Sequence, residues 1–173
     1  MWEDEAEIDL NPRIGVDYMP RGVQRAVPTP GKNAKRYGAG AMDATTDRAM
    51  WVKGERKNSA LFISLLKKLL VEYAEKRVIH VICDNYTIHS SKQTRAWLAE
   101  DGTKFRLHFL PPYCPDDNRI ERKLWREVHA NCTVNHRCET TDELMAEVVH
   151  YLMKHNRRVL KAGVPELRPA ISP

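Results

Sequence analysis

Three acidic residues stand out in this sequence because of where they fall: Asp4, Asp84 and Glu121. Asp4 lies on the apolar side of an alternating segment, where an unpaired carboxylate is costly and needs a partner or a metal ion. Asp84 follows a buried apolar run, at the kind of strand end where open α/β sheets gather their ligands. Glu121 precedes Leu124 by three positions and Val128 by seven, which places it on an apolar helical stripe and aims it at the core. Together the three acids predict one functional site.

Each acid also has a simpler interpretation. Asn118 lies three residues before Glu121, the spacing of a helix-capping pair. Asp84 and Asn85 could end a strand in a turn, and Asp4 is near enough to the first residue to fray into water. Because all three simpler interpretations would have to hold at once, the three acids together favour a site.

The elements that must position these acids begin with a strand. Apolar and polar residues alternate from Trp2 to Leu10, which predicts a strand with one face toward the core. The acids on its other, polar face are Glu3, Glu5, Glu7 and Asp9. Two further extended segments, 36–42 and 49–52, are separated by a turn at 43–47, so we expect an antiparallel meander.

Helical and extended patterns alternate after the meander. The expected helices cover 59–75, 91–100, 118–130 and 142–155, and the expected strands cover 78–83 and 105–110. The 78–83 segment is an almost continuous apolar run, typical of a strand buried on both faces. This order predicts an α/β fold in one domain, residues 1–160, followed by a loose Pro-rich tail over 161–173.

Positive charge is concentrated in one part of the chain. The 173 residues carry a net charge of +5, and nine basic against three acidic residues lie between Arg21 and Lys57. Turn-forming residues and cations from 29 to 37 suit a loop that holds phosphates, although a solvated basic loop has the same composition. The candidate DNA-binding residues are Arg25, Lys32, Lys35 and Arg36.

The sequence lacks the features of a membrane or secreted protein. No apolar run approaches the roughly 18 residues that span a bilayer, and the acidic first residues are unlike a secretory signal. The four cysteines are too few and too scattered for a disulfide framework in a chain of this length. We therefore expect an intracellular protein with reduced thiols.

A set of motifs resembles the DDE transposases of the Tc and mariner superfamily, most closely the bacterial insertion-sequence group called IS-six-thirty. The motifs are Asp4-Glu5, the run Val81–Tyr86 with His89, and the run Leu110–Glu121 with Trp125. Asp84 and Glu121 are 37 positions apart in the sequence, close to the separation usual in that superfamily. The resemblance covers roughly residues 4–156.

The resemblance implies a ribonuclease H-like fold, with a mixed central sheet flanked by helices, that cuts and joins DNA at transposon ends. Asp4, Asp84 and Glu121 would hold two Mg²⁺ ions, with Mn²⁺ able to substitute, because hard carboxylate oxygens suit these ions. Two such ions can stabilise both the attacking and the leaving oxygen of an in-line displacement. The residues expected to support the metal ligands from behind are Asn85, His89 and Asn118. The implied partner is DNA, at transposon ends and target, bound by a homodimer in the bacterial cytoplasm at the nucleoid.

Two departures from the family pattern shape the alternatives. Many relatives have Pro where this chain has Arg119, a change that should leave a metal site intact because Pro there serves only the helix start. Family members usually carry a long DNA-reading helix-turn-helix region ahead of the first acid, and here only three residues precede Asp4. We expect either the catalytic part of a longer or split protein, or an inactive remnant that at most binds DNA or a partner.

Two further hypotheses fit parts of the sequence. A zinc site could be built from four side chains within ten residues, although the usual paired ligand spacing is missing. These are His129, Cys132, His136 and Cys138. A ribonuclease H-like junction resolvase would share the metal chemistry, but the run Pro111–Glu121 argues for a transposase instead.

Overall fold

A computed structural model describes residues 1–111 and 117–163 of the chain. Five strands form one sheet in the order β3-β2-β1-β4-β5. Their bounds are β1 (Trp2–Asp9), β2 (Lys35–Met42), β3 (Ala49–Gly54), β4 (Ile79–Cys83) and β5 (Phe105–Phe109). Strands β1, β2 and β3 pair antiparallel, as the predicted meander requires, whereas β4 is parallel to both β1 and β5. The sheet is therefore mixed, and β1 lies at its centre.

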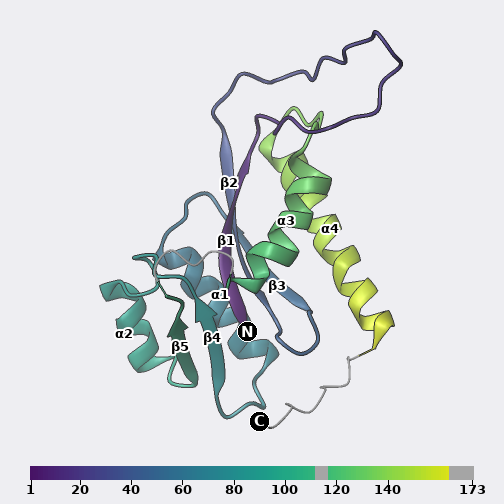
Figure 1. Cartoon of the computed structure of the whole chain (residues 1–173). Coiled ribbons are helices and arrows are strands. Elements are labelled where there is room, and N and C mark those ends of the chain that lie inside the picture. Colours follow the sequence, from purple (N-terminus) through teal and green to yellow (C-terminus); the bar gives the residue numbers. More distant parts are fainter. Residues whose placement is uncertain (112–116, 164–173) are drawn as a thin grey trace.

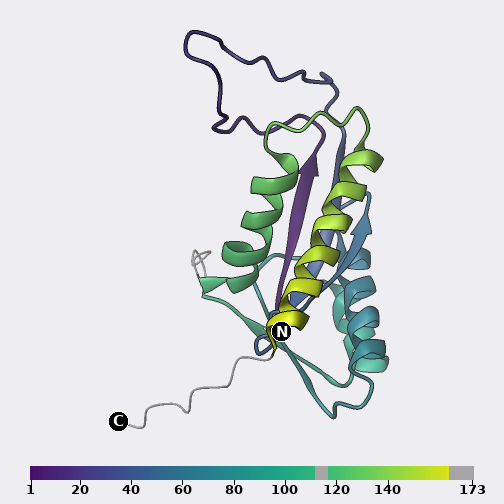
Figure 2. The ribbon, with the colours of Figure 1, turned by 90° about the vertical axis from the view of Figure 1, so that its right-hand side faces the viewer.

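Helices cover both faces of this sheet (Figures 1 and 2). On one face α1 (Ser59–Glu72) and α2 (Lys92–Glu100) enclose a core that includes Phe62, Leu66 and Val81. On the other face α3 (Arg126–Val128), the π-helical turns around it and α4 (Thr141–Ala162) pack on Ala6 and Ile8 of β1. Helix α1 ends three residues earlier than predicted, and α4 continues to Ala162 rather than ending at His155.

The expectation that β1 has a solvent-facing polar side was wrong. Glu3 is fully buried and Glu5 is 7% exposed, and only Glu7 toward the end of the strand is exposed. The alternation itself is real, but β1 is the central strand of a sheet covered on both faces, so both of its sides are interior. Polar residues on the second side therefore face protein instead of water.

The helical segment after residue 117 contains two π-helical turns, η2 (Glu121–Trp125) and η3 (His129–Thr133), on either side of α3. Trp125 from this segment packs directly over Gly40 of β2, where a Cβ atom would lie 2.5 Å from the indole Cζ2. The missing side chain at residue 40 is thus what lets this helical segment sit close to the sheet.

The connection between β1 and β2, residues 10–34, extends well beyond the end of the sheet (Figure 1). Its first part is tied to the end of η3, because the Arg13 N–H donates to the Thr133 carbonyl at 2.9 Å and the Asn135 N–H donates to the Arg13 carbonyl at 2.9 Å. Residues 29–34 of the predicted phosphate-holding loop lie in this excursion, whereas residues 35–37 belong to β2. The predicted tail over 161–173 falls largely outside the described residues. None of the described helices combines the length and the apolar character needed to cross a membrane.

Candidate active site

Asp4 is held in the middle of the sheet and does not fray. It pairs opposite Gly40 within the eight-residue β1–β2 ladder and is 8% exposed, on the same side of β1 as Ala6. Burial, helped by the nearby carboxylates of Glu5 and Glu121, raises its pKa to about 7, against a smaller opposing effect from Lys57. Asp4 is therefore a buried acid with too little positive charge around it, as predicted for a residue that needs a partner or a metal ion.

Asp84 follows the last residue of β4. Trp2 of β1 pairs with Ile82 of β4 in parallel register, so β1 runs toward Asp4 in the same direction as β4 runs toward Asp84. The Asp84 Oδ1 atom accepts hydrogen bonds from the Tyr86 N–H at 2.8 Å and from the ring of His89 at 3.1 Å. The hydrogen bond from His89 is the main reason that the pKa of Asp84 is lowered. Its side chain is 45% exposed, so the carboxylate is fixed on one oxygen yet accessible.

Glu121 is exposed, so the expectation that it points into the core was wrong. The buried stripe of this helical segment consists of Ile120, Leu124, Trp125 and Val128. A π-helical turn holds more residues than an α-helical turn, and it starts at Glu121, so the α-helical spacing counted from this residue does not apply. Glu121 instead lines an open cavity of about 1040 Å³ together with Asp4. The two acids face the same space.

Asn118 ties this helical segment to β1. Its side-chain amide is buried and donates to the carbonyl oxygen of Glu3 at 3.2 Å, next to Asp4 in the strand. The Asn118 side chain therefore does not form a capping pair with Glu121. Asn85 is exposed and donates to the carbonyl oxygen of Leu110, which joins the ends of β4 and β5.

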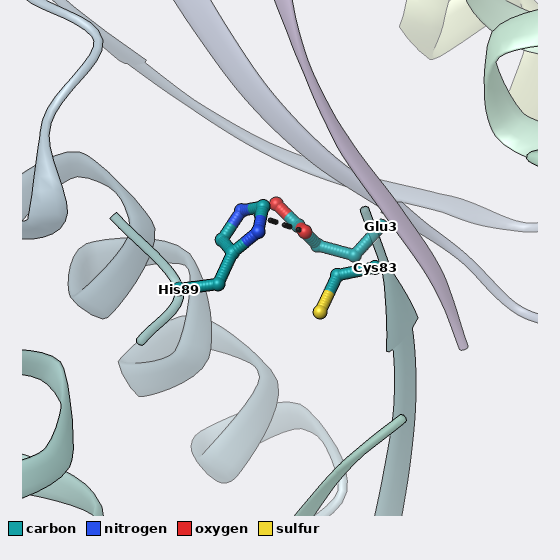
Figure 3. Close-up of side chains that lie close together, drawn as sticks. All are labelled: Glu3, Cys83 and His89. Atoms are coloured by element: carbon teal, nitrogen blue, oxygen red, sulfur yellow. Dashed lines mark ion pairs between the residues drawn. The ribbon is translucent and has the colours of Figure 1, made fainter. Parts of the chain in front are cut away.

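A buried group of charged side chains lies behind the acids and was only partly foreseen (Figure 3). The His89 Nε2 atom lies 3.2 Å from Glu5 Oε1 and 3.4 Å from Glu3 Oε2, and all three side chains are fully buried. Lys57 pairs with the other Glu5 oxygen at 3.3 Å. Burial would lower the pKa of His89, but the hydrogen bond to Asp84 and the nearby acids raise it well above its usual value. Glu3, by contrast, has a raised pKa because it is completely buried.

The resemblance motifs pointed to two members of this buried group, Glu5 and His89. Glu5 was assigned no role and Glu3 was missed, because a central strand covered on both faces cannot be told from an edge strand by alternation alone. Within the described residues, Glu3, Cys83 and His89 are also the one group of three metal-ligating side chains whose ligand atoms lie within 4.8 Å of one another.

Three of the four predicted DNA-binding cations are engaged by acids. Arg25 pairs with Asp17, Lys35 pairs with Glu7 at 2.6 Å, and Arg36 lies 3.9 Å from Asp142. The fourth predicted cation, Lys32, is exposed in the long β1–β2 connection.

A second group of cations, which sequence reasoning did not select, lies beside the acids. Arg13, Arg122 and Arg126 line the same cavity as Asp4 and Glu121. Arg122 and Arg126 also line an adjoining cavity of about 660 Å³ with Arg119 and Lys123, both of which pair with Asp47. The four-residue spacing of 122 and 126 on a helix could have indicated this group.

The cysteine and histidine residues between 129 and 138 do not form a metal site. The Cys132 thiol donates weakly to the Glu147 carbonyl, and the His136 ring accepts from the Cys138 N–H at 3.2 Å. His129 Nδ1 contacts the Thr133 hydroxyl at 3.1 Å. Cys83, Cys132 and Cys138 are free thiols, as predicted, and Cys114 lies outside the described residues.

Residues 1–145 match the family described as DDE superfamily endonuclease. The chain belongs to this family. It is 46% identical over 151 residues to a protein of Shigella sonnei called "Insertion element IS630 uncharacterized 39 kDa protein", an alignment that covers 87% of this chain and 43% of that protein. The expectation of an insertion-sequence transposase of the DDE type is thereby confirmed at the level of the family.

Solved structures of low sequence identity share the fold. The Mos1 transposase paired-end complex with left transposon end matches 92% of this chain and 50% of its own, with a TM-score of 0.66 and 18% identity. The crystal structure of the mariner Mos1 paired end complex with Mg matches with a TM-score of 0.61 and 19% identity. The intasome of simian T-cell lymphotropic virus matches with a TM-score of 0.52 and 16% identity. The fold is ribonuclease H-like, as predicted, and the chain spans about half the length of the relatives that it matches.

Proposed function

We propose that this chain is the catalytic domain of a transposase, which cleaves DNA at transposon ends and joins those ends to target DNA with the help of divalent metal ions. The observation that carries the proposal is the buried, poorly compensated carboxylate of Asp4, which faces one cavity with Glu121. Its strand runs parallel to β4, the strand that Asp84 follows. Membership of the DDE endonuclease family gives this arrangement its chemistry.

The residues present suit Mg²⁺ or Mn²⁺. Carboxylate oxygens are the ligands that these hard ions prefer, and the charge that Asp4 lacks is positive. Asp4, Asp84 and Glu121 would hold two ions, which when bound polarise the phosphodiester and activate the attacking oxygen. Mos1 has been crystallised with Mn and with Mg, which supports the same ions here.

The chain's own residues have separate roles in this site. Asp84 is presented with Oδ1 already fixed by Tyr86 and His89, so little order is lost when it binds an ion. Asn118 holds the start of the helical segment that carries Glu121 against β1. Asn85 joins the ends of β4 and β5 below the site.

DNA would lie along the cations that border the cavity. Arg122 and Arg126 are exposed and share the cavity with the acids, so they are placed to hold phosphates beside the cleaved bond. Arg25, Lys32, Lys35 and Arg36, in or next to the long connection, would hold DNA farther from the site. We propose that a homodimer assembles on the transposon ends, that end recognition uses an amino-terminal DNA-reading region, and that the protein acts at the bacterial nucleoid.

The test is nicking of supercoiled plasmid by the purified chain with Mg²⁺ or Mn²⁺, which needs no knowledge of the end sequence. Asp84→Asn is almost isosteric, so it should fold normally while nicking falls by at least about a hundredfold. Asp101→Asn, an exposed acid at the end of α2, is the matched control and should nick like the parent. Equal nicking by parent and Asp84→Asn would overturn the assignment of the site. Absence of nicking together with absence of Mn²⁺ binding would favour an inactive remnant.

A further inference from the structure

Beyond the contact of His89 with Asp84, the buried group of charged side chains behind Asp84 has no assigned part in the chemistry. His89 is at its centre, with Nδ1 3.1 Å from Asp84 Oδ1 and also 3.1 Å from the Asp84 carbonyl oxygen. Its other ring nitrogen, Nε2, lies between the carboxylates of Glu5 and Glu3. Both nitrogens therefore face oxygen acceptors, and the imidazole connects acids from two strands of the sheet.

The ring has little freedom to turn. The side chain is fully buried, and the ring packs at 4.6 Å between centroids on Phe62 of α1. Any flip of the imidazole would break its contacts with Asp84 and with Glu5 together. The orientation of His89 is therefore set by the buried acids, and one oxygen of Asp84 is in turn set by His89.

Glu5 connects this group of charged side chains to the rest of the site. One of its oxygens contacts His89 at 3.2 Å, and the other contacts the Lys57 ammonium at 3.3 Å. Lys57 also lies 4.4 Å from the centre of the Tyr86 ring, and the Tyr86 N–H is the second donor to Asp84 Oδ1. Both donors that fix Asp84 are thus connected to Glu5.

We propose that Glu5 is a positioning residue that acts through His89 to fix Asp84 for metal binding, and that it is not itself a metal ligand. The proposal rests on the proposed function only in taking Asp84 as a ligand. Metal-ligating side chains are commonly oriented by such hydrogen-bonded partners, and loss of a partner typically weakens metal affinity about 10- to 100-fold.

Two substitutions at residue 89 separate positioning from mere space filling. The amide nitrogen of Asn can replace Nδ1 and still donate to Asp84, whereas that of Gln replaces Nε2 and reaches only toward Glu5. We expect His89→Gln, which loses the donor to Asp84, to weaken Mn²⁺ binding about tenfold or more. His89→Asn keeps that donor but loses the contact with Glu5, so its Mn²⁺ affinity should fall between those of His89→Gln and the parent. Mn²⁺ binding by calorimetry, without DNA, is the readout, with melting temperature in the absence of metal recorded for each variant.

Glu5→Gln keeps the shape of the side chain and removes its charge. It should weaken Mn²⁺ binding several-fold, while Glu75→Gln, an exposed acid away from the site that pairs with Lys76, should leave it unchanged. A positioning role also predicts that Glu5→Gln adds little in a chain that already carries His89→Gln, because the two residues act in series.

Each other outcome would overturn the proposal. Equal Mn²⁺ affinity in the parent, His89→Gln and Glu5→Gln would leave these residues a structural role only. Additive losses in the double variant would make Glu5 a metal ligand in its own right. Stoichiometric zinc in the parent, lost in Cys83→Ala, would mean that an ion bound by Glu3, Cys83 and His89 orders this region instead. Mn²⁺ binding as expected, without nicking, would count against DNA cleavage by this chain on its own but leave this inference intact.

Discussion

The buried acids on the two faces of β1 have very different amounts of positive charge around them. On one face Asp4 is buried near Glu121, with Lys57 as the main opposing charge, and its pKa rises to about 7. On the other face Glu5 has direct contacts with both Lys57 and His89. One strand thus carries an acid in need of a cation and an acid that already has two.

This difference distinguishes the face of β1 that is suited to bind metal from the face that is suited to orient the ligands. A buried acid without a partner destabilises the folded chain, and such a cost persists where function requires it. A buried acid with partners mainly fixes geometry, because removing one partner leaves the other uncompensated. On this basis we assign metal binding to the face of Asp4 and orientation to the face of Glu5 and His89.

The largest effect on stability should follow loss of His89. His89→Ala leaves Glu3 and Glu5 buried without their shared partner, so the free energy of unfolding should fall by about 3–5 kcal/mol. Urea unfolding at pH 7 without metal measures this change. His80→Ala, which removes an exposed imidazole stacked on His108, is the control and should change stability by no more than about 0.5 kcal/mol. A similar loss in both variants would mean that the buried acids do not depend on the ring.

On the Asp4 face, removal of a charge should instead increase the free energy of unfolding. At pH 8 and without metal, Asp4→Asn should be more stable than the parent by about 2–4 kcal/mol, although it should not nick DNA. The folded-state pKa of Asp4 is about 7 and the ordinary value is 3.8, so the folded chain binds the extra proton between these limits. The stability of the parent therefore falls as the pH rises from about 4 to 7 and then levels off.

Urea unfolding at pH 8, 6 and 4 tests this sign. The advantage of Asp4→Asn should shrink at pH 6 and be nearly gone at pH 4, where the carboxyl is protonated in the folded state and about half protonated in the unfolded state. Mn²⁺ should stabilise the parent at pH 8 and have little effect on Asp4→Asn. An Asp4→Asn chain that is less stable than the parent at pH 8 would show that the acid is compensated after all.

Much of the fold could be predicted because the signals were local. The apolar run of β4, the alternation of β1 and the helical pattern that begins at residue 59 each act within a few residues, and each element formed where expected. What could not be predicted was the depth of β1, because the partners of Glu3 and Glu5 come from residues 57 and 89. Such partners are brought together only by the sheet order.

The candidate site was predicted in type but not in detail. Asp4 and Asp84 were found because an acid on an apolar strand face, or at a strand end, is unusual by itself. The exposure of Glu121 was missed because α-helical spacing was applied across a π-helical turn. Arg122 and Arg126 were missed because their value depends on the cavity they share with Asp4, which no sequence window contains.

The contrast between the two faces of β1 also predicts where DNA contacts the protein. The charged group on the far face is enclosed, whereas Asp4 opens into a cavity bordered by cations. The salt dependence of binding to a short DNA duplex should therefore be set mainly by the cations on the Asp4 face of β1. Lys32 lies in the long connection, and Lys35 and Arg36 lie at the start of β2. Changing all three to Ala should flatten the salt dependence less than the loss of three free cations would, because Lys35 and Arg36 already face acids.

The smallest and most specific effect should come from the cations at the cavity. Arg122→Ala with Arg126→Ala should weaken binding and reduce the slope of log affinity against log salt by about 1.8, as expected for two phosphate contacts on duplex DNA. Arg119→Ala with Lys123→Ala removes the same charge from the adjoining cavity, which Asp4 and Glu121 do not line, so the slope should change by less than half as much. Equal slopes for the two double variants would place the DNA elsewhere. A larger change from the second pair would move the DNA path toward Asp47, away from the face that Asp4 opens onto.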